Sequence, residues 1–136
     1  MVKYSGILFL IIIFLSCGKD DNNGVPEVYV RYNLTIQEFE LNDVNGVLTV
    51  HNEGVAGIII YKAPDNTYKA YDRCSTVNPE KKCAVVPDDG SFTATDPCSG
   101  AKYFLSDGSP AKAPAVRSLK RYRVSTTNFQ ILVSND

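Results

Sequence analysis

The 136-residue chain has a single histidine, His51, and no tryptophan. It also has no marked excess of charge, because 14 basic residues stand against 15 acidic ones and the net charge is −1. A bulk basic field of the kind that binds nucleic acid is therefore excluded. No motif for a Ser-His-Asp triad surrounds the one histidine. We expect no nucleic-acid partner, no catalytic residues and a protein that is not an enzyme.

Three further absences limit the kinds of structure that the chain can form. No segment shows a sustained helical period, and no Cys-x-x-Cys pair is present to hold a structural zinc ion. The longest apolar run, residues 6–14, is shorter than the roughly 20 residues that a membrane-spanning helix needs. With 44% hydrophobic and 21% charged residues, the composition is that of one soluble globular domain.

The short apolar run fits the central region of a signal peptide, preceded by the positive charge of Lys3. Leu15 and Ser16 then stand directly before Cys17, and this ending resembles the lipobox of bacterial lipoproteins. That resemblance implies that residues 1–16 are removed and that Cys17 is acylated and becomes the first residue of the mature chain. The expected partner is therefore a membrane, contacted through the lipid anchor.

Residues 17–26 are polar, contain glycine and asparagine, and read as a flexible tether to a β domain over residues 27–136. No aspartate directly follows Cys17, so the usual signal for retention at the inner membrane is missing. Lys19, Asp20 and Asp21 resemble the export signal of surface-exposed lipoproteins in some Gram-negative groups. We expect an outer-membrane location, with exposure to the exterior as the favoured orientation.

The rest of the chain reads as short strands with turn residues between them, typical of an all-β antiparallel sandwich or barrel. In the first strand, five apolar residues share one face by strict alternation: Val28, Val30, Tyr32, Leu34 and Ile36. Residues 55–62 are nearly continuously β-branched and predict a strand buried on both faces. The predicted strands are 27–36, 47–51, 55–62, 67–72, 83–86, 92–95, 102–105 and a final hairpin within 119–134. In that hairpin we expect Tyr122 and Val124 on one arm, and Phe129, Ile131 and Val133 on the other, to face the core.

An ordered set of short motifs spans residues 47 to 134. Tyr71-Asp72-Arg73-Cys74 closes a hairpin, and Pro97, Cys98, Gly100 and Tyr103 follow in a second loop. Asp107-Gly108 marks a tight turn, and Ser109-Pro110-Ala111 a proline loop. This order resembles the Rieske iron–sulfur domain. The resemblance implies an all-β Rieske-like fold with a smaller loop subdomain, and its family cofactor is a [2Fe-2S] cluster.

The cluster ligands of that family are two cysteines and two histidines. In this chain the four matching positions are degenerate: Cys74, Thr76, Asp96 and Ser99. If the register instead makes Cys98 the second cysteine, its histidine position falls on Ala101. No histidine occurs in either register, and His51 lies on an earlier strand. We therefore expect no cofactor and no metal; a three-cysteine site completed by Asp96 or a serine is a weaker alternative.

Some Rieske domains carry a disulfide between the two cluster loops, and Cys83 and Cys98 match its positions. The resemblance therefore implies a Cys83–Cys98 bond, with Cys74–Cys98 as the alternative. Once Cys17 is acylated, one thiol is left over, which is expected to be Cys74. It reads either as a buried small residue or as a reactive thiol beside Arg73.

Three functions follow from these observations. The first is a lipid-anchored Rieske-like domain of the cell envelope that has lost its cluster and acts as a non-catalytic binding or structural module. The second is a Rieske-type [2Fe-2S] electron-transfer protein, and the third is a thiol redox protein that uses Cys74. The sequence names no protein or glycan partner.

Overall fold

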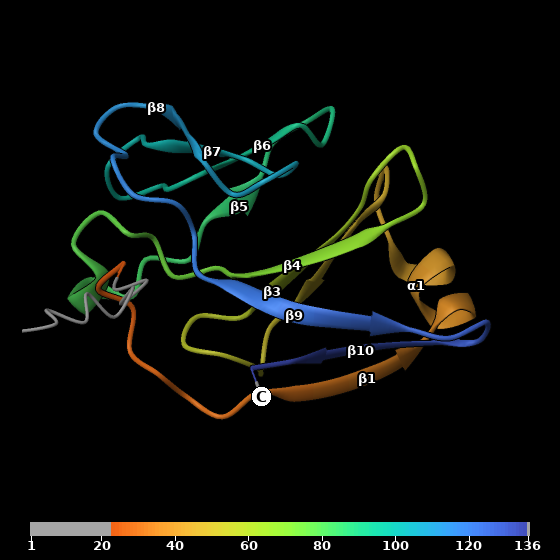
Figure 1. Ribbon diagram of the computed structural model, residues 1–136. Helices are drawn as coiled ribbons and strands as arrows, with labels where there is room; N and C mark the ends of the chain where they lie inside the picture. Colours follow the sequence, from red (N-terminus) through yellow and green to blue (C-terminus); the bar gives the residue numbers. More distant parts are fainter. Residues whose placement is uncertain (1–22, 136) are drawn as a thin grey trace, which may run out of the picture.

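The computed structural model describes residues 23–135, and Figure 1 shows them as a layered β structure. In chain order its elements are β1 (Arg31–Thr35), α1 (Ile36–Asn42), β2 (Val47–Val50), β3 (Ile58–Lys62), β4 (Tyr68–Asp72), a 3-10 helix (Pro79–Lys81), β5 (Val86–Pro87), β6 (Thr93–Thr95), β7 (Lys102–Phe104), β8 (Pro110–Lys112), β9 (Arg121–Thr126) and β10 (Gln130–Ser134). Every strand pair is antiparallel, which confirms the all-β prediction. No helix among the described residues is long and apolar enough to cross a membrane. Cys17 and the predicted signal peptide lie outside the described residues.

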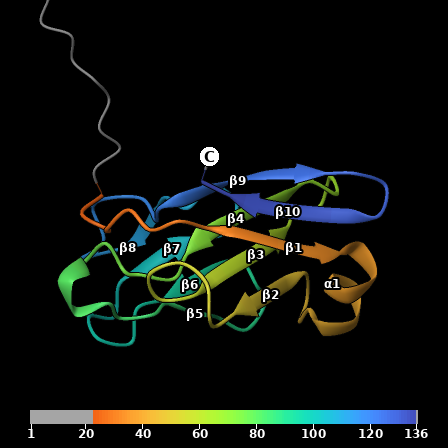
Figure 2. The ribbon, with the colours of Figure 1, turned by 90° about the horizontal axis from the view of Figure 1, so that it is seen from below.

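The larger of the two sheets has six strands in the order β1-β10-β9-β4-β3-β2. It curls into a half barrel, in which β1, β10 and β9 face β2, β3 and β4 across an apolar core (Figures 1 and 2). Side chains from both halves fill this core: Val30, Leu34, Phe39, Ile58, Ile60, Ala70, Tyr122, Ile131 and Val133. The inward residues of the first and last strands therefore alternate as predicted.

The smaller sheet, in the order β5-β6-β7-β8, covers the other face of β3 and β4. Ile59, Tyr61 and Tyr71 of the larger sheet pack there against Tyr103 of β7 and against Leu105, in the turn that follows β7. As a result, β3 lies between two cores, and its three isoleucines are completely buried. The prediction of a strand buried on both faces is confirmed over Ile58–Lys62, but its first part was wrong, because Val55 and Ala56 lie in the turn before β3.

A short helix, α1, stands where the sequence predicted the end of a strand. The prediction of a strand to Ile36 without a helix was wrong, because Thr35 and Glu38 form a capping box. The Thr35 hydroxyl accepts a hydrogen bond from the Glu38 amide at 3.0 Å, and a Glu38 carboxylate oxygen accepts one from the Thr35 amide at 2.7 Å. The helix points Phe39 into the core of the half barrel, where its ring meets Tyr68 edge-on.

Other local differences lie at turns and edges. Phe129 was predicted to face the core, but it is 77% exposed because it belongs to the turn between β9 and β10, where its amide donates to Thr127. The predicted strand at 83–86 is reduced to β5, and β8 within the proline loop was not predicted. Val25, placed in the tether by its sequence, is only 6% exposed, so packing begins before residue 27.

Candidate functional site

Two loops beside the smaller sheet carry the positions that the sequence singled out. The first loop, residues 73–85, follows β4, and the second loop, residues 96–101, joins β6 to β7. The four predicted ligand positions lie on them: Cys74, Thr76, Asp96 and Ser99. A disulfide joins Cys83 to Cys98, with Cα atoms 6.3 Å apart, which is the pairing that the resemblance implied. The two loops are therefore held together covalently.

Asp96 is completely buried and forms the polar centre between the two loops. One carboxylate oxygen accepts hydrogen bonds from the hydroxyls of Ser75 at 2.7 Å and Ser99 at 2.6 Å. The other oxygen accepts one from the Cys98 amide at 2.8 Å. Burial by itself raises the pKa of Asp96, but these hydrogen bonds outweigh it and hold the pKa below its ordinary value. The carboxyl group is therefore ionised at neutral pH.

Tyr103 of β7 extends this network, through Thr76, to Arg117 in the segment between β8 and β9. Its buried hydroxyl lies 3.0 Å from the Thr76 hydroxyl and 3.2 Å from that of Ser75, and it accepts a hydrogen bond from the Thr76 amide at 3.2 Å. The Thr76 hydroxyl donates in turn to the Arg117 carbonyl at 2.8 Å. Among the described residues, no buried side-chain nitrogen or oxygen is left without a partner. The space between the loops is thus filled by a satisfied polar network.

A second buried carboxylate, Asp72, lies at the end of β4, directly before the first loop. It accepts hydrogen bonds from the amides of Val55 at 2.7 Å, Ala56 at 3.2 Å and Cys74 at 2.8 Å. The Tyr122 hydroxyl donates a fourth at 2.6 Å. Burial, followed by this hydrogen bond to a carboxylate, raises the pKa of Tyr122. Asp72 therefore ties the first loop to β9 and to the turn before β3.

Cys74 is the one free cysteine of the described residues, and it is completely buried. Its single thiol proton is shared between two acceptors, the Pro79 carbonyl at 3.5 Å and the Ser75 carbonyl at 3.7 Å. Burial, with a smaller contribution from the charge of Asp72, raises the pKa of Cys74 to about 11. The group is a thiol at neutral pH, which is the inert state of a buried cysteine rather than the reactive thiolate.

One group of possible metal ligands occurs within residues 23–135, namely Cys83, Asp96 and Cys98, whose ligand atoms lie within 4.8 Å of one another. Both sulfurs belong to the disulfide, so neither can act as a thiolate ligand. His51 is exposed and lies outside this group, with its Nδ1 3.3 Å from Arg73 Nη1. The chain's only histidine is therefore not part of the group of possible ligands near Thr76 and Ser99.

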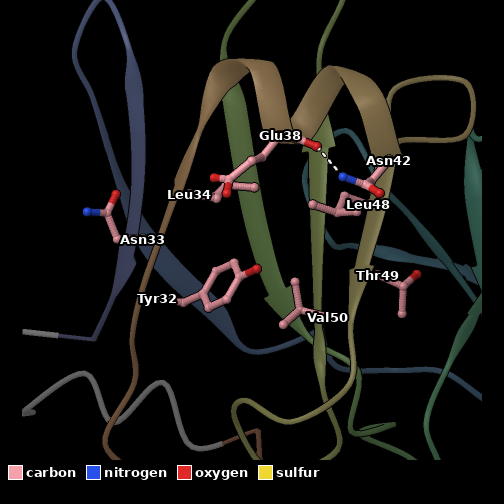
Figure 3. Close-up of a pocket in the computed structure, with 8 residues that line it drawn as sticks. All are labelled: Tyr32, Asn33, Leu34, Glu38, Asn42, Leu48, Thr49 and Val50. Atoms are coloured by element: carbon pink, nitrogen blue, oxygen red, sulfur yellow. Dashed lines mark hydrogen bonds between the residues drawn. The ribbon is translucent and has the colours of Figure 1, made fainter.

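A cavity of about 490 Å³ lies between β1, α1 and β2 (Figure 3). Tyr32 and Val50 point toward it, while Asn33 and Thr49 point away from it. Glu38, its one acidic residue, already serves the capping box of α1. None of the eight lining residues is a histidine or a cysteine. The cavity has no pair of groups suited to nucleophilic or acid–base chemistry.

A second cavity, of about 340 Å³, lies between β2 and the turn before β6 and includes Asp88. The Asp88 carboxylate accepts hydrogen bonds from the hydroxyls of Thr93 and Thr95 and from the Lys102 ammonium at 2.9 Å. Its oxygens are thus used within the smaller sheet. This is the structural role expected of a turn carboxylate rather than of a calcium ligand.

Sequence reasoning missed the roles of Ser75, Asp72 and the Tyr103 hydroxyl. Asp96 offered a readable signal, because an aspartate followed two residues later by Cys98 can accept that residue's amide in a local turn. The contacts of Asp96 with Ser75, and of Asp72 with Tyr122, join residues 21 and 50 positions apart. No local pattern predicts such pairs.

Comparison with known proteins identifies the architecture. No protein-family model matches the chain, and no curated protein does. The plasma membrane Rieske protein PetC3 from Synechocystis PCC 6803 is similar in structure, with a TM-score of 0.58 and 22% identity over 79% of this chain and 98% of that one. The ferredoxin of carbazole 1,9a-dioxygenase from Nocardioides aromaticivorans IC177 has a TM-score of 0.54 and 17% identity, over 81% of this chain and 100% of that one. A chain from the complex of reduced oxygenase and oxidized ferredoxin in carbazole 1,9a-dioxygenase has a TM-score of 0.54 and 16% identity, over 79% of this chain and 94% of that one. At these identities the likeness shows a shared fold, and the chain has the Rieske-like fold.

Proposed function

We propose that this Rieske-like domain works without an iron–sulfur cluster, as a non-catalytic binding or structural module held at the cell envelope by a lipid on Cys17. The observation that carries the proposal is the hydrogen bonding of the Asp96 carboxylate. It stands at a position where the fold family has a ligand cysteine, and three protein donors already satisfy its carboxylate. A buried carboxylate that is fully hydrogen-bonded needs no metal ion to balance it.

The residues present do not fit a histidine-ligated two-iron cluster. Such a cluster takes two thiolates and two imidazoles. Thr76 and Ser99 offer hydroxyls at the imidazole positions, and both are engaged in hydrogen bonds within the loops. Cys98, the other candidate thiolate, is bonded to Cys83. Only Cys74 remains as a possible ligand, and one ligand does not hold a cluster.

The purified chain tests this proposal through its iron, acid-labile sulfide and visible spectrum, followed by electron paramagnetic resonance after reduction. We expect a colourless protein without stoichiometric iron. Cys74→Ser serves as the matched control, because it removes the last free cysteine sulfur at a ligand position and should leave iron content and spectrum unchanged. A brown protein with two irons per chain, whose colour is lost in Cys74→Ser, would overturn the proposal.

A second candidate function is electron transfer, which the solved structures of the same fold favour because one is a Rieske protein and another a ferredoxin. Fold alone does not carry a function to a chain whose site residues differ. Reversible reduction, followed by a change in the visible spectrum during titration with a reductant, would favour this candidate over the first. A thiol redox role has less support, because Cys74 is buried and its pKa is raised to about 11.

The anchor and the location form a separate part of the proposal, supported by the sequence before residue 23. Growth with a labelled fatty acid should label the full chain, and Cys17→Ser should abolish the label. Membrane fractionation then tests the outer membrane, and protease added to intact cells tests exposure to the exterior. A chain that carries no label, or that stays in the inner membrane, contradicts this part and leaves the cluster-free site untouched.

A further inference from the structure

The disulfide that joins the two loops lies against a buried carboxylate. The sulfur atoms of Cys83 and Cys98 and a carboxylate oxygen of Asp96 lie within 4.8 Å of one another. Two thiolates and a carboxylate on one tetrahedral zinc ion lie about 3.5–3.8 Å from one another, because Zn–S bonds are about 2.3 Å and Zn–O bonds about 2.0 Å long. The three side chains therefore come close to the spacing of a zinc site, and the bond between the two sulfurs is what prevents them from binding a metal ion.

Backbone hydrogen bonds hold Cys83 in place independently of the disulfide. The Ser75 amide donates to the Cys83 carbonyl at 2.8 Å. The Val85 amide donates to the Arg73 carbonyl at 2.7 Å, and an antiparallel bridge pairs the same two arms of the first loop. We expect this pairing to keep Cys83 beside the second loop when the disulfide is reduced.

The second loop is also closed by its own backbone. The Asp96 amide donates to the Ala101 carbonyl at 2.8 Å, and the Gly100 amide donates to the Asp96 carbonyl at 2.8 Å. Within this turn the Cys98 amide donates to an Asp96 carboxylate oxygen at 2.8 Å. The hydrogen bonds therefore fix Cys98 next to Asp96 whether or not its sulfur is bonded to Cys83.

The Asp96 carboxylate has the capacity to bind a metal ion in addition to its hydrogen-bond donors. An ionised carboxylate offers about four acceptor positions on its two oxygens. The Ser75 and Ser99 hydroxyls use two positions on one oxygen, and the Cys98 amide uses one on the other. One position on the second oxygen remains. Hydrogen bonds of this kind commonly stand behind a ligating carboxylate, because they fix its orientation.

The disulfide is open to attack by a dithiol reductant, because Cys98 is exposed and Cys83 is half-buried. A thiolate of the reductant attacks the Cys98 sulfur, and the Cys83 sulfur leaves with the electron pair of the broken bond and takes up a proton. The second thiol of the reductant then displaces the Cys98 sulfur and closes the reductant's own disulfide. The reductant loses two electrons, and the chain gains two thiols, whose protons are released when a metal ion binds.

We infer that Cys83, Cys98 and Asp96 form a zinc site that is blocked in the oxidised chain and becomes available when a dithiol reduces the disulfide. Three protein ligands leave the fourth position of the ion to water, on the exposed side beside Cys98. Cys74 is not a ligand of this site, because its thiol proton is directed to the carbonyls of Pro79 and Ser75. The inference goes beyond the proposed function, which concerns iron and does not depend on zinc.

Zinc titration followed by native mass spectrometry tests the inference on the chain from residue 17 with Cys17→Ser. This form keeps every described residue and removes the one cysteine outside them. Dithiothreitol reduces the chain and is removed without oxygen before zinc is added, because a dithiol itself binds zinc. We expect one zinc ion per reduced chain and none on the oxidised chain. Zinc should also raise the urea midpoint of the reduced chain and leave that of the oxidised chain unchanged.

Asp96→Asn keeps the shape of the side chain and removes the charged ligand. We expect the zinc affinity of the reduced chain to fall by more than the roughly 10–100-fold that loss of an outer-shell partner costs. Cys74→Ser is the matched control, because it removes the other thiol of the described residues and should leave zinc binding unchanged. No zinc on the reduced chain, equal zinc on the oxidised chain, or a reduced chain that stays unfolded with zinc would overturn the inference. So would loss of zinc in Cys74→Ser or full affinity in Asp96→Asn.

Discussion

Tyr103→Phe is the sharpest single change for testing the polar network between the two loops. The substitution keeps the buried ring and removes only the hydroxyl, which accepts the Thr76 amide at 3.2 Å and lies within hydrogen-bonding distance of the Ser75 and Thr76 hydroxyls. The Ser75 and Thr76 hydroxyls already donate to Asp96 and to the Arg117 carbonyl, so they lose no acceptor when the Tyr103 hydroxyl is removed. The amide cannot rotate, and Thr76 is only 3% exposed, so water does not replace the lost partner.

Leaving one buried amide unsatisfied costs about 1–3 kcal/mol of unfolding free energy, and we expect a loss of about 2 kcal/mol. Tyr71→Phe is the internal comparison. That hydroxyl is also buried, but it makes one bond, to the Leu105 carbonyl at 2.9 Å, and an under-satisfied carbonyl is tolerated better than an orphaned amide. We expect about 1 kcal/mol for this change.

Urea unfolding, followed by circular dichroism on the non-acylated chain, measures both variants. Equal slopes are required before midpoints are compared, because a changed slope would mean a changed unfolded state. The reasoning fails if Tyr103→Phe costs no more than Tyr71→Phe. That outcome would mean that the loops are held by the disulfide and by apolar packing, with no contribution from the network.

Three further outcomes follow from the same contacts. Removing the disulfide with Cys83→Ser/Cys98→Ser should lower the unfolding free energy by about 3 kcal/mol, because it frees a closed loop of 15 residues; an unchanged urea midpoint would contradict this. The folded-state pKa of Asp96 lies below its unfolded value of about 3.9, so its stabilisation is complete above that pH and is lost as pH falls through the folded pKa. Asp96→Asn should therefore flatten the fall of the melting temperature under acid, and an equally steep fall in the variant would count against it. Because burial raises the pKa of Cys74 to about 11, the native thiol should resist iodoacetamide near pH 8 until urea is added, whereas rapid labelling of the folded chain would show a reactive site.

The parts of the fold that the sequence predicted are those with a local, periodic cause. Residues 58–60 are isoleucines in succession, and a strand between two apolar layers buries all three. The missed helix α1 also had a local signal, since Thr35 and Glu38 stand at capping-box spacing. Seven residues are too few for a helical period to emerge, so the capping signal was the one available clue.

In the candidate site, too, some contacts could be predicted from the sequence and others could not. The bond between Cys83 and Cys98 could be anticipated because few cysteines compete for partners and a resemblance ordered them. The hydrogen bonds of Asp96 and Tyr103 could not, because they depend on how the smaller sheet sits over β4 and on which hydroxyl fills each gap. Phe129 was predicted to be buried because it alternates with Ile131 and Val133, but β10 begins at Gln130, so Phe129 lies outside the strand and is exposed.

The buried carboxyl group of Asp72 accepts hydrogen bonds from three separate parts of the chain: the turn before β3, the first loop and β9. The amides of Val55 and Ala56 belong to a surface turn, where hydrogen–deuterium exchange is ordinarily fast. Here they open only if a buried carboxyl group loses its hydrogen-bond donors, which costs enough free energy to suppress local fraying. Exchange at these two positions should therefore follow global unfolding, so that a piece of the surface reports on the integrity of the interior.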